Sequence, residues 1–443
     1  MKIFFMSLGC DKNLVDSEHM LGLLRTNGFE FTDDEYEADI IVINTCCFIN
    51  DAKEESINSI IEMGQRKQDA KCKKLVVCGC LAQRYTDEIH EQLPEVDVIV
   101  GTTALEDIVV AINDSLNKDN VKCDYINDIN VLSGVEAPRI VSTGGHFSYL
   151  KIAEGCDKHC TYCIIPKIRG NFRSVPMEVL VKEAKTLAQQ GVKELILVAQ
   201  ETTMYGVDLY GQKSLHILLE KLCEIDGLHW IRVLYCYPEE IYDELIDVIA
   251  KEKKICKYLD IPIQHASDNI LKRMGRRTSN ADLRAIVSKL REKIPGVILR
   301  TTLISGFPGE TEEDHQILID FVDEMEFERL GVFTYSPEEN TPAAEFDNQI
   351  DEEVKEDRRA QIMELQQEII EDKSDEIIGE VFDAIVEGKI PDENAYMTRT
   401  YMDIPGVDSN VFVVTDEPLM TGDFIKVKIT GAQDYDLIGD IVL

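Results

Sequence analysis

The sequence has no apolar run that approaches the roughly 18–20 residues of a membrane span. The N-terminal stretch MKIFFMSLGCDKNLVD is apolar over too few residues for the core of a signal peptide, and no small-residue cleavage site follows it. These absences exclude a membrane protein and predict a cytoplasmic one. In a reducing compartment, the thirteen cysteines are expected to be free thiols, metal ligands or catalysts and not disulfides.

Basic residues are also scarce, because 46 Lys and Arg stand against 83 Asp and Glu, which gives a formal net charge of −37. Such a chain has no general electrostatic route to nucleic acid. Two interpretations remain open: the acidic surface serves solubility, or it binds a basic partner. Internal repeats and low-complexity tracts are absent, and a length of 443 residues predicts two to four domains.

The first predicted domain, residues 1–116, alternates buried strand patterns with helical patterns, which indicates a small open parallel α/β sheet. Residues 117–141 are polar and irregular and are predicted to be a linker. The strands are expected at 2–9, 38–45, 74–80 and 96–101, and the helices at 16–28, 53–64 and 105–114.

The alternation resumes over residues 142–374, where six strand patterns predict a partial, barrel-like (β/α)6 parallel sheet. A long charged helix is expected at 351–377. Residues 375–443 contain five short strand patterns, which predict a small antiparallel barrel of OB type. The six strands of the central domain are expected at 147–154, 194–200, 230–235, 258–264, 297–306 and 329–335.

Three cysteines lie close together in EGCDKHCTYCIIP, residues 154–166: Cys156, Cys160 and Cys163. Thiolates are soft ligands for zinc or iron–sulfur clusters. A structural zinc needs four ligands, and the next cysteine, Cys223, is sixty residues away. A 4Fe-4S cubane on three cysteines keeps one iron open for a substrate or cofactor. A zinc site completed from elsewhere and three buried structural thiols remain as alternatives.

Further cysteines follow three predicted strands of the first domain: Cys10, the pair Cys46 and Cys47, and Cys80. Ligands of open parallel sheets bind outside the carboxyl ends of the strands, so these thiols are expected at one rim. Adjacent residues of an extended chain point in opposite directions, so only one of Cys46 and Cys47 is expected to be a ligand. Cys78 lies inside its strand pattern and is expected to pack in the core. A coincidence of strand-end thiols is the alternative.

The Cys156-x-x-x-Cys160-x-x-Cys163 spacing, with Tyr162 before the last cysteine, resembles the signature of the radical S-adenosylmethionine (SAM) superfamily. The resemblance implies that the open iron chelates the amino and carboxylate groups of SAM. It also implies that SAM is cleaved there to methionine and a 5′-deoxyadenosyl radical, which removes hydrogen from an unactivated carbon.

The whole chain resembles the methylthiotransferase family, since SLGCDKNLVDSE, VINTCCF, VCGCLAQR and EGCDKHCTYCIIPKIRG occur in that family's order. This resemblance implies an N-terminal methylthiotransferase domain, a radical SAM core and a C-terminal TRAM domain. It also implies a second 4Fe-4S cluster on Cys10, Cys46 and Cys80, and it selects Cys46 over Cys47. The two clusters would use two SAM molecules, one for the methyl group and one for the radical.

Other candidate cofactor contacts lie at the ends of the core strands, where barrel active sites are found. The glycines of GFPGE allow a close backbone approach to a ligand, or form a plain β–α turn. Arg300, inside a strand, needs a buried anionic partner, either the SAM carboxylate or a core acid. The strand-end side chains can alternatively be simply solvated. The predicted SAM contacts are Gln200, Glu201, Gln264, His265, Arg300, Gly306 and Gly309.

Two features favour one methylthiotransferase group over another. SLGCDKNLVDSE resembles the SLGCPKNLVDSE of the RimO-like group, which modifies the β-carbon of an aspartate in ribosomal small-subunit protein twelve; Asp11 replaces the usual Pro. The C-terminal 69 residues carry fifteen Asp and Glu against four basic residues, which suits a basic ribosomal protein and argues against tRNA. A reductant and a sulfur donor are further expected partners. The alternatives are a MiaB- or MtaB-like tRNA adenosine methylthiotransferase and a non-catalytic iron–sulfur protein.

Overall fold

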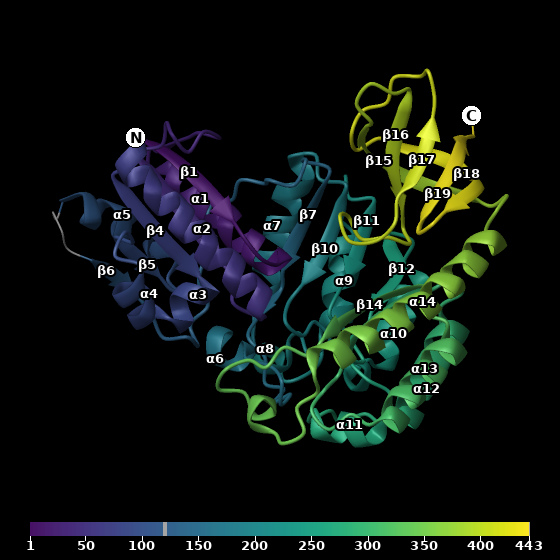
Figure 1. Ribbon diagram of the computed structural model, residues 1–443. Helices are drawn as coiled ribbons and strands as arrows, with labels where there is room; N and C mark the ends of the chain where they lie inside the picture. The colour runs from purple at the N-terminus through teal and green to yellow at the C-terminus, as the bar shows by residue number, and fades with distance from the viewer. Residues whose placement is uncertain (118–121, 443) are drawn as a thin grey trace.

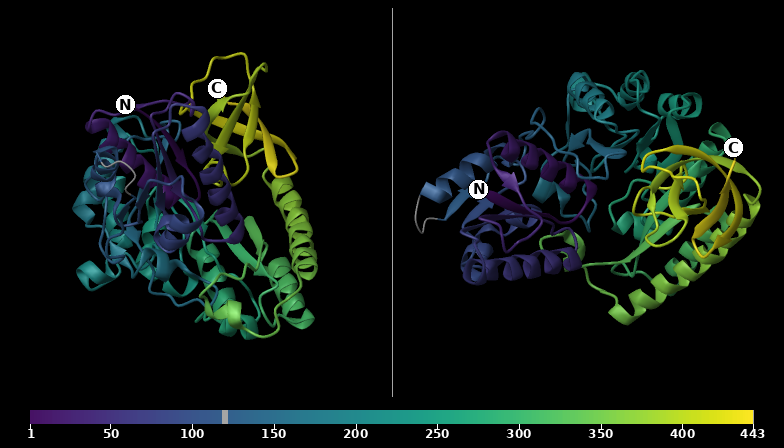
Figure 2. Two further views of the ribbon diagram at one scale, coloured as in Figure 1. Left: turned by 60° about the vertical axis from the view of Figure 1, so that its left-hand side comes forward. Right: turned by 90° about the horizontal axis from the view of Figure 1, so that it is seen from above.

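The computed structural model describes residues 1–117 and 122–442 and contains three packed bodies (Figure 1). In Figure 1 the N-terminal domain lies to the left of the central core and the C-terminal barrel lies at the upper right, and the view from above in Figure 2 also shows these two domains apart. Within the described residues, no helix combines the length and the hydropathy of a membrane-spanning segment.

The N-terminal domain is a six-stranded parallel sheet in the order β2-β1-β3-β4-β5-β6. Strand β3 reads IIVINT and is buried on both faces, because Ile41 and Ile43 pack into one apolar cluster and Ile40 and Val42 into another. The strands are β1 Lys2–Ser7, β2 Glu30–Phe31, β3 Ile40–Thr45, β4 Lys74–Gly79, β5 Val98–Val100 and β6 Cys123–Tyr125. The helices are α1 Asp11–Thr26, α2 Asn50–Asp69, α3 Cys80–Arg84, α4 Thr86–Gln92, the 3-10 turn Leu105–Asp107 and α5 Ile108–Asn117.

The open α/β sheet predicted for this domain is confirmed, with differences at its edges. Strands β2 and β6 were not predicted, because each has only two or three residues and no apolar run. Strand β6 lies inside the predicted linker, so pairing with β5 extends the sheet to Tyr125.

The central core is an open parallel sheet whose strands pair in chain order from β7 to β14, which confirms the predicted partial barrel. Its strands are β7 Phe147–Lys151, β10 Glu194–Val198, β11 Trp230–Val233, β12 Ile255–Asp260, β13 Ile298–Ser305 and β14 Arg329–Thr334, beside a small pair, β8 Ala153–Glu154 and β9 Arg173–Ser174. Its helices are α6 Ile165–Arg169, α7 Met177–Gln189, α8 Val207–Tyr210, α9 Leu215–Cys223, α10 Asp243–Lys251, α11 Asp268–Arg273, α12 Asn280–Lys293, α13 Glu312–Met325 and α14 Glu352–Glu376, with 3-10 turns at Pro238–Glu240 and Pro342–Glu345.

The C-terminal domain is a closed five-stranded barrel in the order β15-β16-β17-β19-β18. Four of its pairings are antiparallel, and the fifth, β17 with β19, is parallel. The strands are β15 Val381–Lys389, β16 Ala395–Thr400, β17 Val411–Val414, β18 Phe424–Gln433 and β19 Asp436–Ile441.

The barrel packs on the face of the core sheet that the core helices leave free. Ile196, Val198 and Tyr258 of the core share one apolar cluster with barrel residues, whereas Leu195 and Leu197 point to the helical side. The fully buried Glu194 pairs with Arg232 at 2.9 Å and with Arg399 of the barrel at 2.5 Å. The central core and the C-terminal barrel are therefore joined by a shared apolar cluster and a buried ion network.

Glu194→Gln should destabilise this interface by about 3–5 kcal/mol, because it leaves two buried guanidinium groups without their shared carboxylate. The single tryptophan, Trp230, packs edge-on against Phe424 of the barrel and gives a fluorescence signal for urea unfolding of the contact. Glu220→Gln, a change at an exposed acid of α9, is the matched control and should stay within about 0.5 kcal/mol. Equal stabilities of the two variants would contradict the structural role of Glu194.

Candidate active site

The N-terminal cysteines lie at one rim of the first sheet, as predicted. Cys10, Cys46 and Cys80 directly follow or closely follow β1, β3 and β4, which are neighbours in the sheet. Gly9 has a φ of +87°, and a Cβ on it would lie 2.6 Å from the Cβ of Cys46. The loops after β1 and β3 can therefore touch only because residue 9 is glycine.

Cys46 and Cys47 have different surroundings. Cys47 is fully buried in an apolar cluster, and burial raises its pKa to about 12. Burial also raises the pKa of Cys46, and the neighbouring Cys10 thiol raises it further. Cys78 is fully buried in the other apolar cluster and donates to the carbonyl of Ile43 at 3.3 Å, as the prediction of core packing requires.

The donor set of this rim suits an iron–sulfur cluster, since it consists of three thiols from three adjacent strand ends. Burial raises the pKa of Cys80, and the Arg169 guanidinium opposes that rise. In the described part of the chain, no three His, Cys, Asp or Glu side chains form a site for a single metal ion. A cubane binds each thiolate at a separate iron, so its ligands stand further apart than those of one ion.

The second set of cysteines lies in the loop after β8. Gly155 has a φ of +78°, and a Cβ there would lie 2.1 Å from the carbonyl oxygen of Asn171, so the loop requires glycine. The Cys156 amide donates to the carbonyl of Gly170 at 3.1 Å, and the Cys163 amide to that of Cys160 at 3.0 Å. The loop therefore turns back on itself and brings Cys156, Cys160 and Cys163 together.

Aromatic residues and the turn after α11 hold this loop against the core. The Thr161 amide donates to the carbonyl of Met274 at 2.9 Å. Tyr162 packs edge-on against Phe307, and the Tyr237 hydroxyl lies 3.6 Å from the Cys160 sulfur. Burial raises the pKa of Cys156 to about 12, so this thiol also needs a bound cation to become a thiolate.

Gln200 and Glu201 follow β10 at the same rim. Gln200 donates to the Glu154 carboxylate at 2.7 Å. Glu201 is 1% exposed; one carboxylate oxygen accepts from the Thr203 amide at 2.9 Å, whereas the other, Oε2, is buried without a hydrogen-bond partner among the described residues. Burial raises the pKa of Glu201 to about 7. An orphaned carboxylate oxygen near Cys156 is suited to accept from a ligand's ammonium group.

The other predicted SAM contacts have protein partners. Gln264 adopts a φ of +71° and bonds through its backbone to Thr302 and Ile304. The fully buried His265 accepts from the Ser267 amide at 2.9 Å, and its Nε2 lies 3.6 Å from Glu310. The Gln264 backbone and the His265 ring therefore support the strand-end backbone.

The GFPGE glycines make close approaches to side chains of the protein. A Cβ on Gly306 would lie 2.2 Å from the Cγ of Lys355 in α14, and a Cβ on Gly309 would lie 3.0 Å from the Arg273 guanidinium. Arg300 pairs with Asp260 at 3.0 Å and with Asp408 of the barrel at 3.5 Å. Buried acids are thus its anionic partners in the structure, as one of the two alternatives expects, and a contact of Arg300 with the SAM carboxylate stays a prediction.

Arg276 is a candidate that the sequence analysis missed. Its guanidinium lies 4.4 Å from the centre of the Tyr237 ring and donates to the carbonyl of Pro262 at 2.9 Å. Its Nε and Nη1 are buried and have no hydrogen-bond partner in the part of the chain that the structure describes. Burial of Arg276 alone among the three arginines of RMGRRT cannot be read from the sequence, because the same letters fit an exposed helix end.

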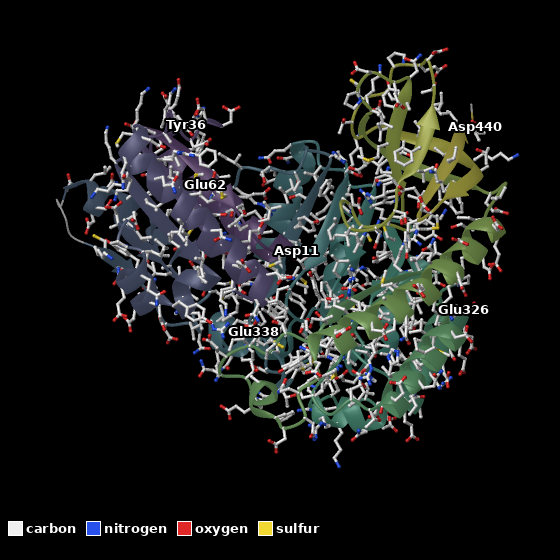
Figure 3. All side chains as sticks on the ribbon, in the orientation of Figure 1. Asp11, Tyr36, Glu62, Glu326, Glu338 and Asp440 are labelled. Atoms are coloured by element: carbon white, nitrogen blue, oxygen red, sulfur yellow. The ribbon has the colours of Figure 1, made fainter. Side chains whose placement is uncertain are left out.

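Both cysteine sets face the junction between the N-terminal domain and the core. Asp11, beside Cys10, accepts from the Tyr235 hydroxyl of the core at 3.3 Å and pairs with Lys12 at 2.9 Å. Arg84 of α3 pairs with Glu338 of the core at 3.0 Å. Figure 3 shows Asp11 and Glu338 at this junction. The unusual Asp11 therefore adds a contact between the domains.

Comparison with family models and curated proteins shows to which family the chain belongs. Residues 2–101 match the uncharacterised protein family UPF0004, residues 150–322 the radical SAM superfamily and residues 378–442 the TRAM domain. A protein of Lachnoclostridium phytofermentans named ribosomal protein uS12 methylthiotransferase RimO is 60% identical over 99% of both chains. The chain belongs to the RimO methylthiotransferase family. The family predicted from the cysteine motifs is confirmed, and the chain is a radical SAM enzyme.

Two further RimO relatives agree with this family. The Acetivibrio thermocellus protein is 51% identical over 100% of this chain and 98% of its own length, and the Clostridioides difficile protein is 49% identical over 100% and 99%. Among solved structures, the radical SAM methyltransferase TsrM of Kitasatospora setae superposes with a TM-score of 0.55 at 14% identity, over 89% of this chain and 80% of that one. At that identity the likeness shows the fold alone.

Proposed function

We propose that this RimO-family chain transfers a methylthio group to the β-carbon of an aspartate in ribosomal protein uS12, in the cytoplasm. The observation that carries the proposal is the placement of two cysteine triads at one domain junction, which Arg169 spans from Cys80 to Glu154. The relatives' names supply the substrate. The tRNA alternative is not favoured, because the related proteins are named for uS12.

In this proposal, Cys10, Cys46 and Cys80 hold one 4Fe-4S cluster, and Cys156, Cys160 and Cys163 hold the other. Bound at these triads, the clusters supply sulfur handling on one side and reductive SAM cleavage on the other. A reductant and a sulfur donor are additional partners.

The protein's own side chains bind and orient the cofactor and exclude water. Glu201 would accept from the SAM amino group through Oε2, and Arg276 would donate to the SAM carboxylate through one of its unpaired donors, Nε or Nη1. The two groups differ in charge type and lie near different cysteines of the loop, Glu201 near Cys156 and Arg276 near Cys160. Gln200 supports this site through Glu154, while Gln264, His265, Gly306 and Gly309 shape the surrounding backbone.

The acidic residues of the barrel include two groups with different surroundings. Asp403 and Asp408 pair with Arg329 and Arg300 of the core and so hold the barrel in place. A second group is exposed on two adjoining turns, which the 2.9 Å hydrogen bond from Asn394 to Asp416 joins. This acidic patch consists of Asp392, Glu393, Asp416 and Glu417. We propose that it attracts the basic uS12.

Charge reversal of the patch, Asp392→Lys with Glu393→Lys and Glu417→Lys, should slow association with uS12 by about tenfold at low salt. Raised salt should shrink the difference, since the Debye length falls to about 3 Å at 1 M. The matched control reverses three exposed acids of α2, Glu54, Glu55 and Glu62, and gives the same net charge. Equal slowing by both variants would reject docking at the patch.

Point substitutions are preferable to deletion of the barrel, because deletion would expose the apolar core face around Ile196 and Tyr258. The substrate itself is tested by mass spectrometry of uS12 from cells that lack this chain. Wild-type protein should restore the methylthio mass increment and Cys156→Ala should not. An unmodified uS12 beside methylthiolated tRNA adenosine would overturn the substrate and leave the radical chemistry standing.

A further inference from the structure

Arg169 connects the two cysteine triads. It is the last residue of α6, six positions after Cys163, and it is 2% exposed. Its guanidinium reaches across the domain junction to the N-terminal domain. Nε and Nη2 both donate to the sulfur of Cys80, at 3.4 and 3.3 Å.

Every N–H of this guanidinium has an acceptor. Besides the two bonds to Cys80, Nη1 donates to Asp16 at 2.7 Å and to Glu154 at 3.2 Å, and Nη2 donates to Asn13 at 2.9 Å. Arginine has five donors in a rigid plane, and all five are used. The orientation of the group toward sulfur is therefore determined from both domains at once.

The ion pairs of Arg169 do not by themselves explain its contact with the Cys80 sulfur. Asp16 and Glu154 are two buried acids, and Lys151 pairs with both of them. Arg169 pairs with these two acids through Nη1 alone. Its Nε edge faces sulfur, which a lysine ammonium at the same place could not reproduce, because it lacks the planar fork.

We propose that Arg169 is a positioning residue of the N-terminal cluster: its two N–H···S hydrogen bonds orient Cys80 and raise the cluster's reduction potential. Hydrogen bonds to cluster sulfurs stabilise the extra negative charge of the reduced cluster, and they therefore raise its reduction potential. Arg169 also binds Glu154, two residues before Cys156, whereas both of its hydrogen bonds to sulfur go to Cys80. The inference rests on the proposed cluster at Cys10, Cys46 and Cys80.

The test is an anaerobic dithionite titration of the intact chain, followed by electron paramagnetic resonance. The core cluster is recognised because added SAM alters its spectrum. In Arg169→Lys, the reduced-to-oxidised ratio of the N-terminal cluster at fixed potential should fall about tenfold, a shift of about 59 mV for one electron. The core cluster should keep its potential. Arg84→Lys, which removes another arginine of the junction whose partners are Glu338 and backbone carbonyls, should shift neither.

A fully loaded Arg169→Lys protein with an unshifted N-terminal potential would overturn the inference. If this variant does not load its cluster, the hydrogen bonds are tested in the intact wild-type chain. The chain is labelled with ¹⁵N-arginine and measured by electron–nuclear double resonance. Hyperfine coupling of the N-terminal cluster to arginine nitrogen supports the hydrogen bonds, and its absence overturns them. A wild-type chain that binds only about four iron atoms would instead overturn the N-terminal ligand set, and so the proposed function as well.

Discussion

Replacement of Cys156, Cys160 or Cys163 by Ala is expected to reduce 5′-deoxyadenosine formation by more than about 100-fold, since loss of even an outer partner of a metal site costs about 10–100-fold. Each of these side chains would hold a separate iron, so no neighbouring thiol can substitute for it. The next cysteine along the chain, Cys223, is on the helix α9. The measurement is anaerobic SAM cleavage with dithionite, quantified by chromatography.

The matched control for this prediction is Cys236→Ala. Cys236 is fully buried beside the core strands, and its sulfur contacts the Thr202 hydroxyl at 3.6 Å. Its loss should cost packing energy of about 1–3 kcal/mol and leave SAM cleavage in place. Normal 5′-deoxyadenosine formation by any of the three loop variants would contradict the ligand assignment.

The combined change of Cys10, Cys46 and Cys80 to Ala is expected to halve the bound iron, from about eight to about four atoms per chain. SAM cleavage should continue, because the loop after β8 takes its hydrogen bonds from the core. Methylthiolation of uS12 should stop. Iron and sulfide analysis after anaerobic reconstitution gives the first result, and mass spectrometry gives the second.

Cys46→Ala and Cys47→Ala form the sharpest pair within this prediction. The two residues are adjacent, yet Cys46 faces Gly9 and Cys10 whereas Cys47 is fully buried in the apolar cluster. Only Cys46→Ala should lower the iron content. Loss of iron in Cys47→Ala with retention in Cys46→Ala would show that Cys47 is the ligand and Cys46 is not. Unchanged iron in the triple variant would contradict the second cluster.

The strand patterns indicated the three bodies and placed two sets of thiols at strand ends, while the resemblance of the cysteine motifs supplied the family. This was possible because each depends on local order: parallel strands send their carboxyl ends to one rim, and a C-x-x-x-C-x-x-C loop needs no distant partner. Short edge strands escaped prediction, since two or three residues such as those of β2 carry no periodicity.

Roles that depend on which side chains meet across domains were decided by the tertiary structure. Arg300 is paired by Asp408 from the barrel, 108 positions later in the chain, which no strand pattern reveals. Arg276 and Arg169 are both arginines near the core triad, but Arg276 has unpaired donors whereas Arg169 makes five hydrogen bonds to four side chains. A sequence determines which charges exist, whereas burial and pairing depend on surfaces that come together only when the domains pack.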